Sequence, residues 1–198
     1  MFLEYSEDLR SVANAIRTCS QILFQKDLID TRSGNISVRF SDKIFIKKTG
    51  ASLPFIEEKD ITIVLLSERR DSDKEASSDV ELHRKIYIQG DKLEKKYGAV
   101  VHTHCPEAVA LSLFFEKIIP TDFEAKYFIK EIVSKNYDDI PKYVAKNGIA
   151  IAKAHGPFSA GENLEDALFK MLMLSNSLKI EIFKNFLTKC IKESKLLI

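Results

Sequence analysis

No apolar segment of this 198-residue sequence approaches the roughly 20 residues that a bilayer-spanning helix needs, so we expect no membrane partner. Charge of one sign is not in excess, since 30 basic residues stand against 29 acidic ones, and this argues against nucleic acid as a partner. The three cysteines are odd in number and far apart, which indicates reduced thiols. The N-terminal stretch MFLEYSEDLR lacks the features of a signal peptide, so we expect a cytoplasmic protein.

What is present suits one globular domain. Hydrophobic residues make up 45% of the chain, and its length can enclose a sizeable core, so we predict a single domain over residues 1–198. Segments with strand-like and helix-like periodicity alternate, and several strands are joined by short turns. This pattern predicts an α/β fold with a mainly antiparallel or mixed sheet.

The predicted elements follow from periodicity and turn residues. In chain order they are a helix over 9–24 with Ser6 as its N-cap, a hairpin over 35–47, a buried strand over 61–66, a polar loop over 67–78, a helix starting near Ser78–Asp79, a strand over 99–103, a helix starting at Pro106, a strand pair around Gly156-Pro157 and a long helix over 162–190. The sequence supports no assignment for residues 116–147.

Two histidines close the strand written AVVHTHCP. Side chains two residues apart on a strand share one face, so His102 and His104 present both imidazoles together. Imidazole is a good ligand for zinc and similar divalent ions, although two hydrogen-bonded histidines at a strand end are the alternative. A third histidine, His155, ends another apolar strand, and we expect the three to share one ion.

A catalytic zinc site has an open position or an added carboxylate. Asp79, after two serines at a helix start, is the best candidate for that carboxylate, and Glu81 is second. An acidic residue favoured by the helix dipole is the alternative interpretation of Asp79. The fourth histidine, His83, is expected to be an ordinary surface or packing residue.

Three short stretches have the composition of loops that bind anions, because glycine exposes backbone N–H groups and hydroxyls donate hydrogen bonds. They are Ser33-Gly34-Asn35 before a strand, Thr49-Gly50 after one, and Ser77-Ser78 before a helix. Each is weak evidence alone, since turns use the same residues.

Taken together, these pieces resemble the class II aldolase/adducin family, which includes fuculose-phosphate aldolase and ribulose-phosphate 4-epimerase. The matching stretches, in order, are SGNISVR, KKTG, SSDVELH, GAVVHTHCPEAVALS and AHGPFSAGENLEDAL. The resemblance implies a three-layer α/β/α sandwich around a mainly antiparallel sheet, and a homotetramer with active sites between subunits.

The resemblance also implies roles for residues. His102, His104 and His155 would bind one Zn²⁺ per subunit, and Asp79 would ligate the metal, move protons or do both. The substrate phosphate would be held by the residues at the matching loop positions, which are Asn35, Thr49, Gly50, Ser77 and Ser78. The chain departs from its relatives in having Asp79 where the aldolases have Glu, Lys126 where the epimerase has an acidic residue, and no tyrosine after Tyr143.

The function implied is a zinc-dependent sugar-phosphate aldolase that cleaves a ketose phosphate through a metal-stabilised enediolate. Epimerisation or dehydration of a sugar phosphate on the same metal site is the nearest alternative. A non-catalytic adducin-like scaffold is a second, although it would not need the three histidines. A cupin-like metal oxygenase is a third, but it predicts a β-barrel, against the helical periodicity at 9–24, 106–115 and 163–190.

Overall fold

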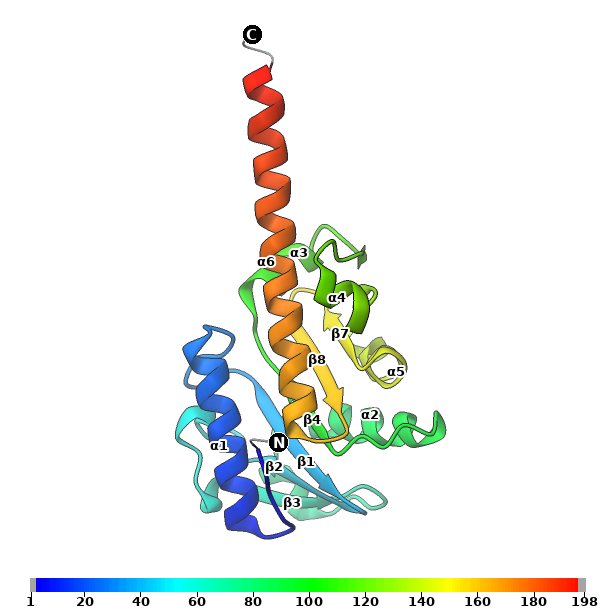
Figure 1. The fold of residues 1–198 in the computed structure, drawn as a ribbon. Coiled ribbons are helices and arrows are strands. Elements are labelled where there is room, and N and C mark those ends of the chain that lie inside the picture. Colours follow the sequence, from blue (N-terminus) through cyan, green and yellow to red (C-terminus); the bar gives the residue numbers. More distant parts are fainter. Residues whose placement is uncertain (1–2, 196–198) are drawn as a thin grey trace.

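The computed structural model describes residues 3–195, and in it one eight-stranded sheet lies between two layers of helices (Figure 1). The strands follow the order β3-β2-β1-β4-β8-β7-β6-β5. Every neighbouring pair is antiparallel except β6 and β7, which run parallel. The prediction of an α/β sandwich around a mainly antiparallel sheet is therefore confirmed.

Strands and helices are interleaved along the chain. The strands are β1 (Asn35–Phe40), β2 (Lys43–Lys47), β3 (Ile61–Leu65), β4 (Ala99–His102), β5 (Lys117–Ile118), β6 (Ile132–Lys135), β7 (Ile149–Ala152) and β8 (Gly156–Gly161). The α-helices are α1 (Leu9–Gln25), α2 (Val80–Lys92), α3 (Pro106–Ser112), α4 (Phe123–Phe128), α5 (Ile140–Asn147) and α6 (Leu164–Lys195). The short 3₁₀ helices are η1 (Leu53–Phe55), η2 (Glu58–Asp60), η3 (Asp71–Glu75) and η4 (Tyr137–Asp139).

Two apolar cores, one on each face of the sheet, follow from the alternation of side chains along the strands. On β4, Ala99 and Val101 belong to the core that includes α1 and α6, whereas Val100 belongs to the core of α2 and α5. The predicted hairpin over 35–47 is confirmed as β1 and β2, and the pair around Gly156-Pro157 as β7 and β8.

Two local predictions were wrong. Helix α1 begins at Leu9 with Asp8 as its N-cap, and the Asp8 carboxylate accepts a hydrogen bond from the Ser11 N–H at 3.0 Å. Ser6 is too far before the helix to cap it, and its N–H donates to Ser11 instead. Strand β3 is not fully buried: it is the edge strand of the sheet, and Ile63 is 43% exposed.

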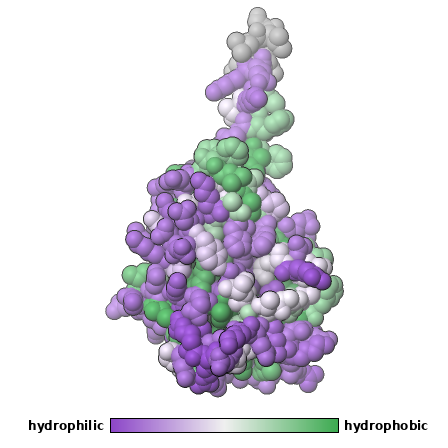
Figure 2. Space-filling view, turned by 180° about the vertical axis from the view of Figure 1, so that it is seen from behind, coloured by the Kyte–Doolittle hydropathy of each residue, from purple (hydrophilic) through white to green (hydrophobic). Residues whose placement is uncertain are grey.

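Helix α6 extends well past the sheet (Figure 1). Its first half packs on the core through residues such as Leu168 and Leu174, but its second half exposes large apolar side chains. Figure 2 shows apolar side chains along the helix where it leaves the rest of the molecule. Among residues 3–195, no helix combines the length and the apolar character that a membrane crossing requires.

Candidate metal and anion site

Three imidazoles meet at the end of β4. His102 is the last residue of β4, His104 follows two residues later, and His155 lies in the turn between β7 and β8. One ligand atom from each ring lies within 4.8 Å of the others, and the Nε2 atoms of His102 and His155 are 3.2 Å apart. Three neutral imidazoles that converge in this way suit a divalent transition metal.

Two contacts with β8 fix the orientation of the His102 ring. Its Nδ1–H donates to the Pro157 carbonyl at 3.0 Å, because a carbonyl can only accept, and its ring stacks on Phe158 with centroids 3.9 Å apart. In the neutral ring the Nε2 lone pair is then free to bind a metal. Burial lowers the pKa of His102 well below its usual value, which favours that neutral form.

Glycine at position 156 lets His155 approach the other two histidines. Gly156 has φ of +147°, and a Cβ there would lie 2.1 Å from the Thr103 carbonyl oxygen. No larger residue fits where the β7–β8 turn crosses the backbone after β4. The motif His155-Gly156 is therefore a geometric requirement of the imidazole cluster.

Asp79 lies beside this cluster and outside it. Its Oδ2 is 4.0 Å from the His102 Nε2, and both carboxylate oxygens already accept hydrogen bonds, one from the Asn35 Nδ2 at 2.6 Å and one from the Tyr137 hydroxyl. Burial opposes ionisation, but the Tyr137 hydroxyl, His102 and the Asn35 amide together hold the pKa of the Asp79 carboxyl below its usual value. Asp79 is thus an ionised carboxylate held next to the three imidazoles.

A buried chain of hydrogen bonds supports Asp79. The Asn35 Oδ1 can only accept, so the His83 Nε2–H donates to it at 2.5 Å. Burial lowers the pKa of His83 to about 4, so its Nδ1 is a lone pair that accepts from the Ser37 hydroxyl at 2.7 Å. Ser37 Oγ in turn accepts from the Tyr87 hydroxyl at 2.8 Å.

This chain corrects the expectation for His83. It is not an ordinary surface or packing residue: it is fully buried on α2 and connects Ser37 to the site. Asn35, predicted to hold phosphate, uses both ends of its amide on His83 and Asp79 in this structure. Its structural role is therefore to orient the carboxylate.

All the predicted anion-binding residues, Asn35 included, line one cavity of about 270 Å³. Thr49, Gly50, Ser77 and Ser78 all contribute to its wall, together with Asp79, His104 and His155. Two backbone hydrogen bonds hold the loops together: the Ser77 N–H donates to the Lys47 carbonyl at 2.9 Å and the Thr49 N–H to the Glu75 carbonyl at 2.9 Å. The cavity therefore joins the hydroxyl-rich loops to the imidazole cluster.

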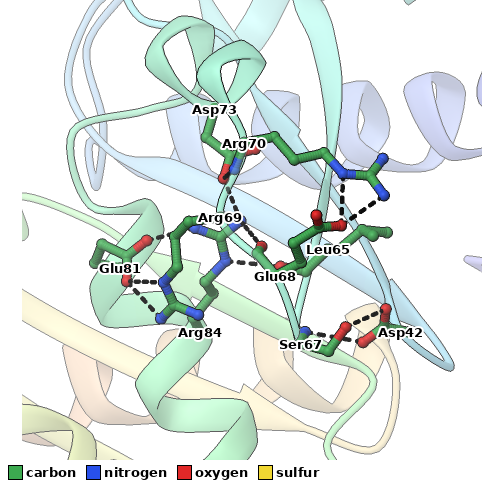
Figure 3. Close-up of polar contacts among 9 residues, drawn as sticks. All are labelled: Asp42, Leu65, Ser67, Glu68, Arg69, Arg70, Asp73, Glu81 and Arg84. Atoms are coloured by element: carbon green, nitrogen blue, oxygen red, sulfur yellow. Dashed lines mark hydrogen bonds and ion pairs between the residues drawn. The ribbon is translucent and has the colours of Figure 1, made fainter.

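Glu81, the second candidate carboxylate, does not reach the site. Its carboxylate is held by Arg69 and Arg84 on the other side of α2 (Figure 3). Arg84 has no exposed side-chain surface and also donates to the Leu65 carbonyl at 2.8 Å and to Asp73 at 2.7 Å. Glu81 thus belongs to a network that fixes the loop before Ser77.

Sequence reasoning missed three residues of the site. Lys47 and Arg32 line the cavity, and Tyr137 stacks on His155 with ring centroids 5.5 Å apart while it donates to Asp79. Lys47 directly follows three consecutive apolar residues, Ile44 to Ile46, in β2, and a charged residue at the end of such a buried run could have been noticed in the sequence. Tyr137 lies in the segment 116–147, which gave none.

Comparisons with known proteins agree with this geometry. A family described as "Class II Aldolase and Adducin N-terminal domain" matches residues 14–182. The L-fuculose phosphate aldolase of Methanocaldococcus jannaschii is 29% identical over 88% of this chain and 96% of its own, and that of Methanococcus maripaludis 27% over 87% and 96%. The crystal structure of l-fuculose-1-phosphate aldolase from Thermus thermophilus superimposes with a TM-score of 0.82 at 25% identity, covering 90% of this chain and 96% of that one.

Proposed function

Because this chain belongs to the class II aldolase and adducin family, we propose that it is a metal-dependent sugar-phosphate aldolase with one Zn²⁺ per subunit. The observation that carries the proposal is the convergence of three imidazoles beside a cavity lined by hydroxyls and cationic side chains. Curated relatives of similar length that are named L-fuculose phosphate aldolase support the same reaction class.

We propose that His102, His104 and His155 are the metal ligands. A divalent cation bound there would polarise the substrate carbonyl and offset the negative charge that develops on its oxygen when the carbon–carbon bond breaks. The donor set would suit zinc, since all three ligand atoms are imidazole nitrogens and two of the rings, those of His104 and His155, line the cavity that would receive substrate.

Asp79 is proposed as the group that moves the proton. Its ionised carboxylate lies at the boundary between imidazoles and cavity, where it can accept a proton from a substrate hydroxyl or return one to carbon. Asn35 and Tyr137 keep the carboxylate in place during that transfer. Both oxygens already have hydrogen-bond partners, which supports a base beside the metal over a permanent ligand.

The substrate phosphate is proposed to bind in the far part of the cavity. Thr49, Gly50, Ser77 and Ser78 line the cavity there, where the hydroxyls of Ser77 and Ser78 can donate, and Gly50 has φ of +78° with open space at its Cβ position. Anchoring the phosphate places the carbonyl and its neighbouring hydroxyl next to the imidazoles. Asn35 lines the same cavity and is proposed to donate its second amide N–H to the phosphate, since its hydrogen bond to Asp79 uses only one of the two.

The second candidate is epimerisation of a sugar phosphate on the same site. The short Asp79 side chain, held away from the imidazoles by Asn35 and Tyr137, favours proton transfer over metal ligation and so keeps this candidate open.

We also propose that the chain forms a single domain over residues 1–198 and that the protein is cytoplasmic. It would assemble as a homotetramer with active sites between subunits. Light scattering of the purified protein tests the tetramer.

A substrate panel tests the reaction. Purified protein with Zn²⁺ is offered dihydroxyacetone phosphate with a set of aldehydes, and separately pentulose phosphates, while metal content is measured by mass spectrometry. We expect about one zinc per chain and aldol product, and neither in His102→Ala. Turnover no higher than in that variant with every phosphorylated sugar would rule out the enzyme, and metal well below one per chain would favour a scaffold.

A further inference from the structure

The turn between β7 and β8, which carries His155, has an unusual backbone conformation. Ala154 has φ of +60°, in the left-handed region that residues with a Cβ seldom occupy, and Gly156 follows with φ of +147°. A residue other than glycine in that region is strained, and the conformation persists only where the surrounding structure holds it. The position of His155 therefore depends on contacts made to this turn from outside.

Hydrogen bonds of the His155 ring do not explain where the ring lies. Within the part of the chain that the structure describes, its one hydrogen-bond partner is the Nε2 of His102 at 3.2 Å, and a shared metal ion would replace that bond. The stacked Tyr137 ring restricts the tilt of the imidazole rather than its distance from His102. That distance must be set by the backbone that carries His155.

A serine at the end of α3 makes a contact of this kind. The Ser112 Oγ accepts a hydrogen bond from the Ala154 N–H at 3.0 Å, and its own hydroxyl donates to the Val109 carbonyl at 2.7 Å. Because the hydroxyl both donates and accepts, its direction is fixed. Ser112 is only 2% exposed, so water competes little for either bond.

Helix α3 connects this hydroxyl to the other two histidines. It begins at Pro106, two residues after His104, ends at Ser112, and packs against β7 and β8. His104 and Ser112 therefore lie at the two ends of one short segment. This segment starts beside the first two imidazoles and holds the turn that carries the third.

We infer that Ser112 is a positioning residue for the metal site, because its hydrogen bond to Ala154 holds the β7–β8 turn where His155 meets the other two imidazoles. The inference rests on the proposed metal ligands and is independent of the reaction that the metal supports. Groups that hold metal ligands from behind commonly change metal affinity by about 10- to 100-fold when they are removed.

Zinc affinity tests the inference directly. The wild type, Ser112→Ala and Ser20→Ala are compared by competition with a chromogenic zinc chelator. Ser20 is the matched control, since it is also buried and also donates to a carbonyl of its own helix, that of Ile16 at 2.7 Å, but lies on α1. We expect Ser112→Ala to weaken zinc binding at least about tenfold and Ser20→Ala to leave it unchanged. Equal affinity in Ser112→Ala and the wild type would overturn the inference.

Visible absorption of the protein loaded with Co²⁺ reports the geometry of the site and needs no turnover. Cobalt absorbs more strongly in a tetrahedral site than in one of higher coordination number, so a displaced His155 changes the spectrum. At saturating cobalt we expect a weaker and shifted band for Ser112→Ala, and the wild-type band for Ser20→Ala. An identical band in Ser112→Ala and the wild type would show that His155 reaches its place without Ser112, and would overturn the inference.

Thermal unfolding of the metal-free proteins separates positioning from general packing. Each variant loses the hydrogen bonding of one buried hydroxyl, so both midpoints should fall slightly while zinc affinity falls only in Ser112→Ala. A loss of zinc affinity in both variants, in proportion to their loss of stability, would overturn the inference and leave the aldolase proposal intact. Zinc binding that depends on Ser112, without aldol turnover by the wild type, would overturn the aldolase proposal alone.

Discussion

His83 and Arg84 are neighbours on α2, neither has exposed side-chain surface, and they stabilise different parts of the molecule. His83 is neutral and belongs to a hydrogen-bond chain that leads from Ser37 through Asn35 to the Asp79 carboxylate. Arg84 is charged and is compensated by Asp73 and Glu81 in the network of Figure 3. Successive helix residues point about 100° apart, so one helix turn serves two networks.

The difference shows how a buried polar residue can be assigned a role. The chain through His83 is made of neutral groups up to the Asp79 carboxylate, which is proposed to move the proton, so disrupting it should change chemistry more than folding. The network around Arg84 connects the helix to the loop over residues 65–73 and contains the buried guanidinium charge. Disrupting it should therefore change folding more than chemistry.

The largest effect is expected where the His83 chain ends. Asp79→Asn keeps the shape of the side chain and removes its ability to accept a proton, so kcat should fall by about 10²- to 10⁴-fold. Steady-state kinetics with the zinc-loaded protein measure this, and the thermal midpoint should change little. A kcat within a few-fold of the wild type would mean that another group moves the proton.

Arg84→Met addresses the other network. It leaves the partly buried Asp73 carboxylate uncompensated and two backbone carbonyls without donors, so the free energy of unfolding should fall by about 3 kcal/mol. Urea denaturation measures it. The matched control is Arg69→Met, because Arg69 and Glu81 form an exposed pair that should contribute less than about 1 kcal/mol. Equal effects of the two variants would contradict the distinction.

Acid stability sharpens the comparison because His83 takes up a proton between pH 6.5 and about 4 when the chain unfolds and the Arg84 network contains no histidine. Its folded pKa of about 4 lies below the unfolded value near 6.5, so the unfolded chain binds more protons between these values. The His83 contribution is complete above about pH 6.5 and is lost as the pH falls toward 4, on the order of 3 kcal/mol in all. Urea denaturation from pH 7 to 4.5 should show a shallower decline for His83→Gln than for the wild type. Parallel declines would count against this assignment.

The smallest effect is expected from Tyr137→Phe. The variant keeps the ring against His155 and removes one hydrogen bond to Asp79, so the pKa of the Asp79 carboxyl should rise toward its usual value. Activity at neutral pH should fall by about tenfold, and the acidic limb of the kcat/KM profile should move to higher pH. An unchanged profile would limit Tyr137 to packing.

Local patterns were enough to predict most of the fold and the imidazole cluster. Two-residue alternation predicted β1, the turn after it predicted β2, and the same alternation put His102 and His104 on one side of a strand end. These features depend on neighbours in sequence, and the structure and the family match agree with them.

The rest of the site depends on contacts between distant segments. Tyr137 reaches Asp79 from a position 58 residues away, and His83 contacts Asn35 across 48 residues. The loop over residues 67–78 was predicted to be an ordinary solvated loop because it carries both signs of charge, but Arg84 on the following helix donates a hydrogen bond to the Glu68 carbonyl. No local periodicity encodes such pairings, and they become visible only when the sheet order is known.

The two halves of helix α6 differ in how much they pack against the rest of the molecule. In the first half, Leu168 and Leu174 are buried in the core. In the second half, Phe183, Phe186 and Leu187 are each more than half exposed. An isolated helical segment of that length is marginal in water. Backbone amide protons should therefore exchange with deuterium slowly near Leu174 and orders of magnitude faster near Leu187. The exchange rate would then rise steeply along a single unbroken helix.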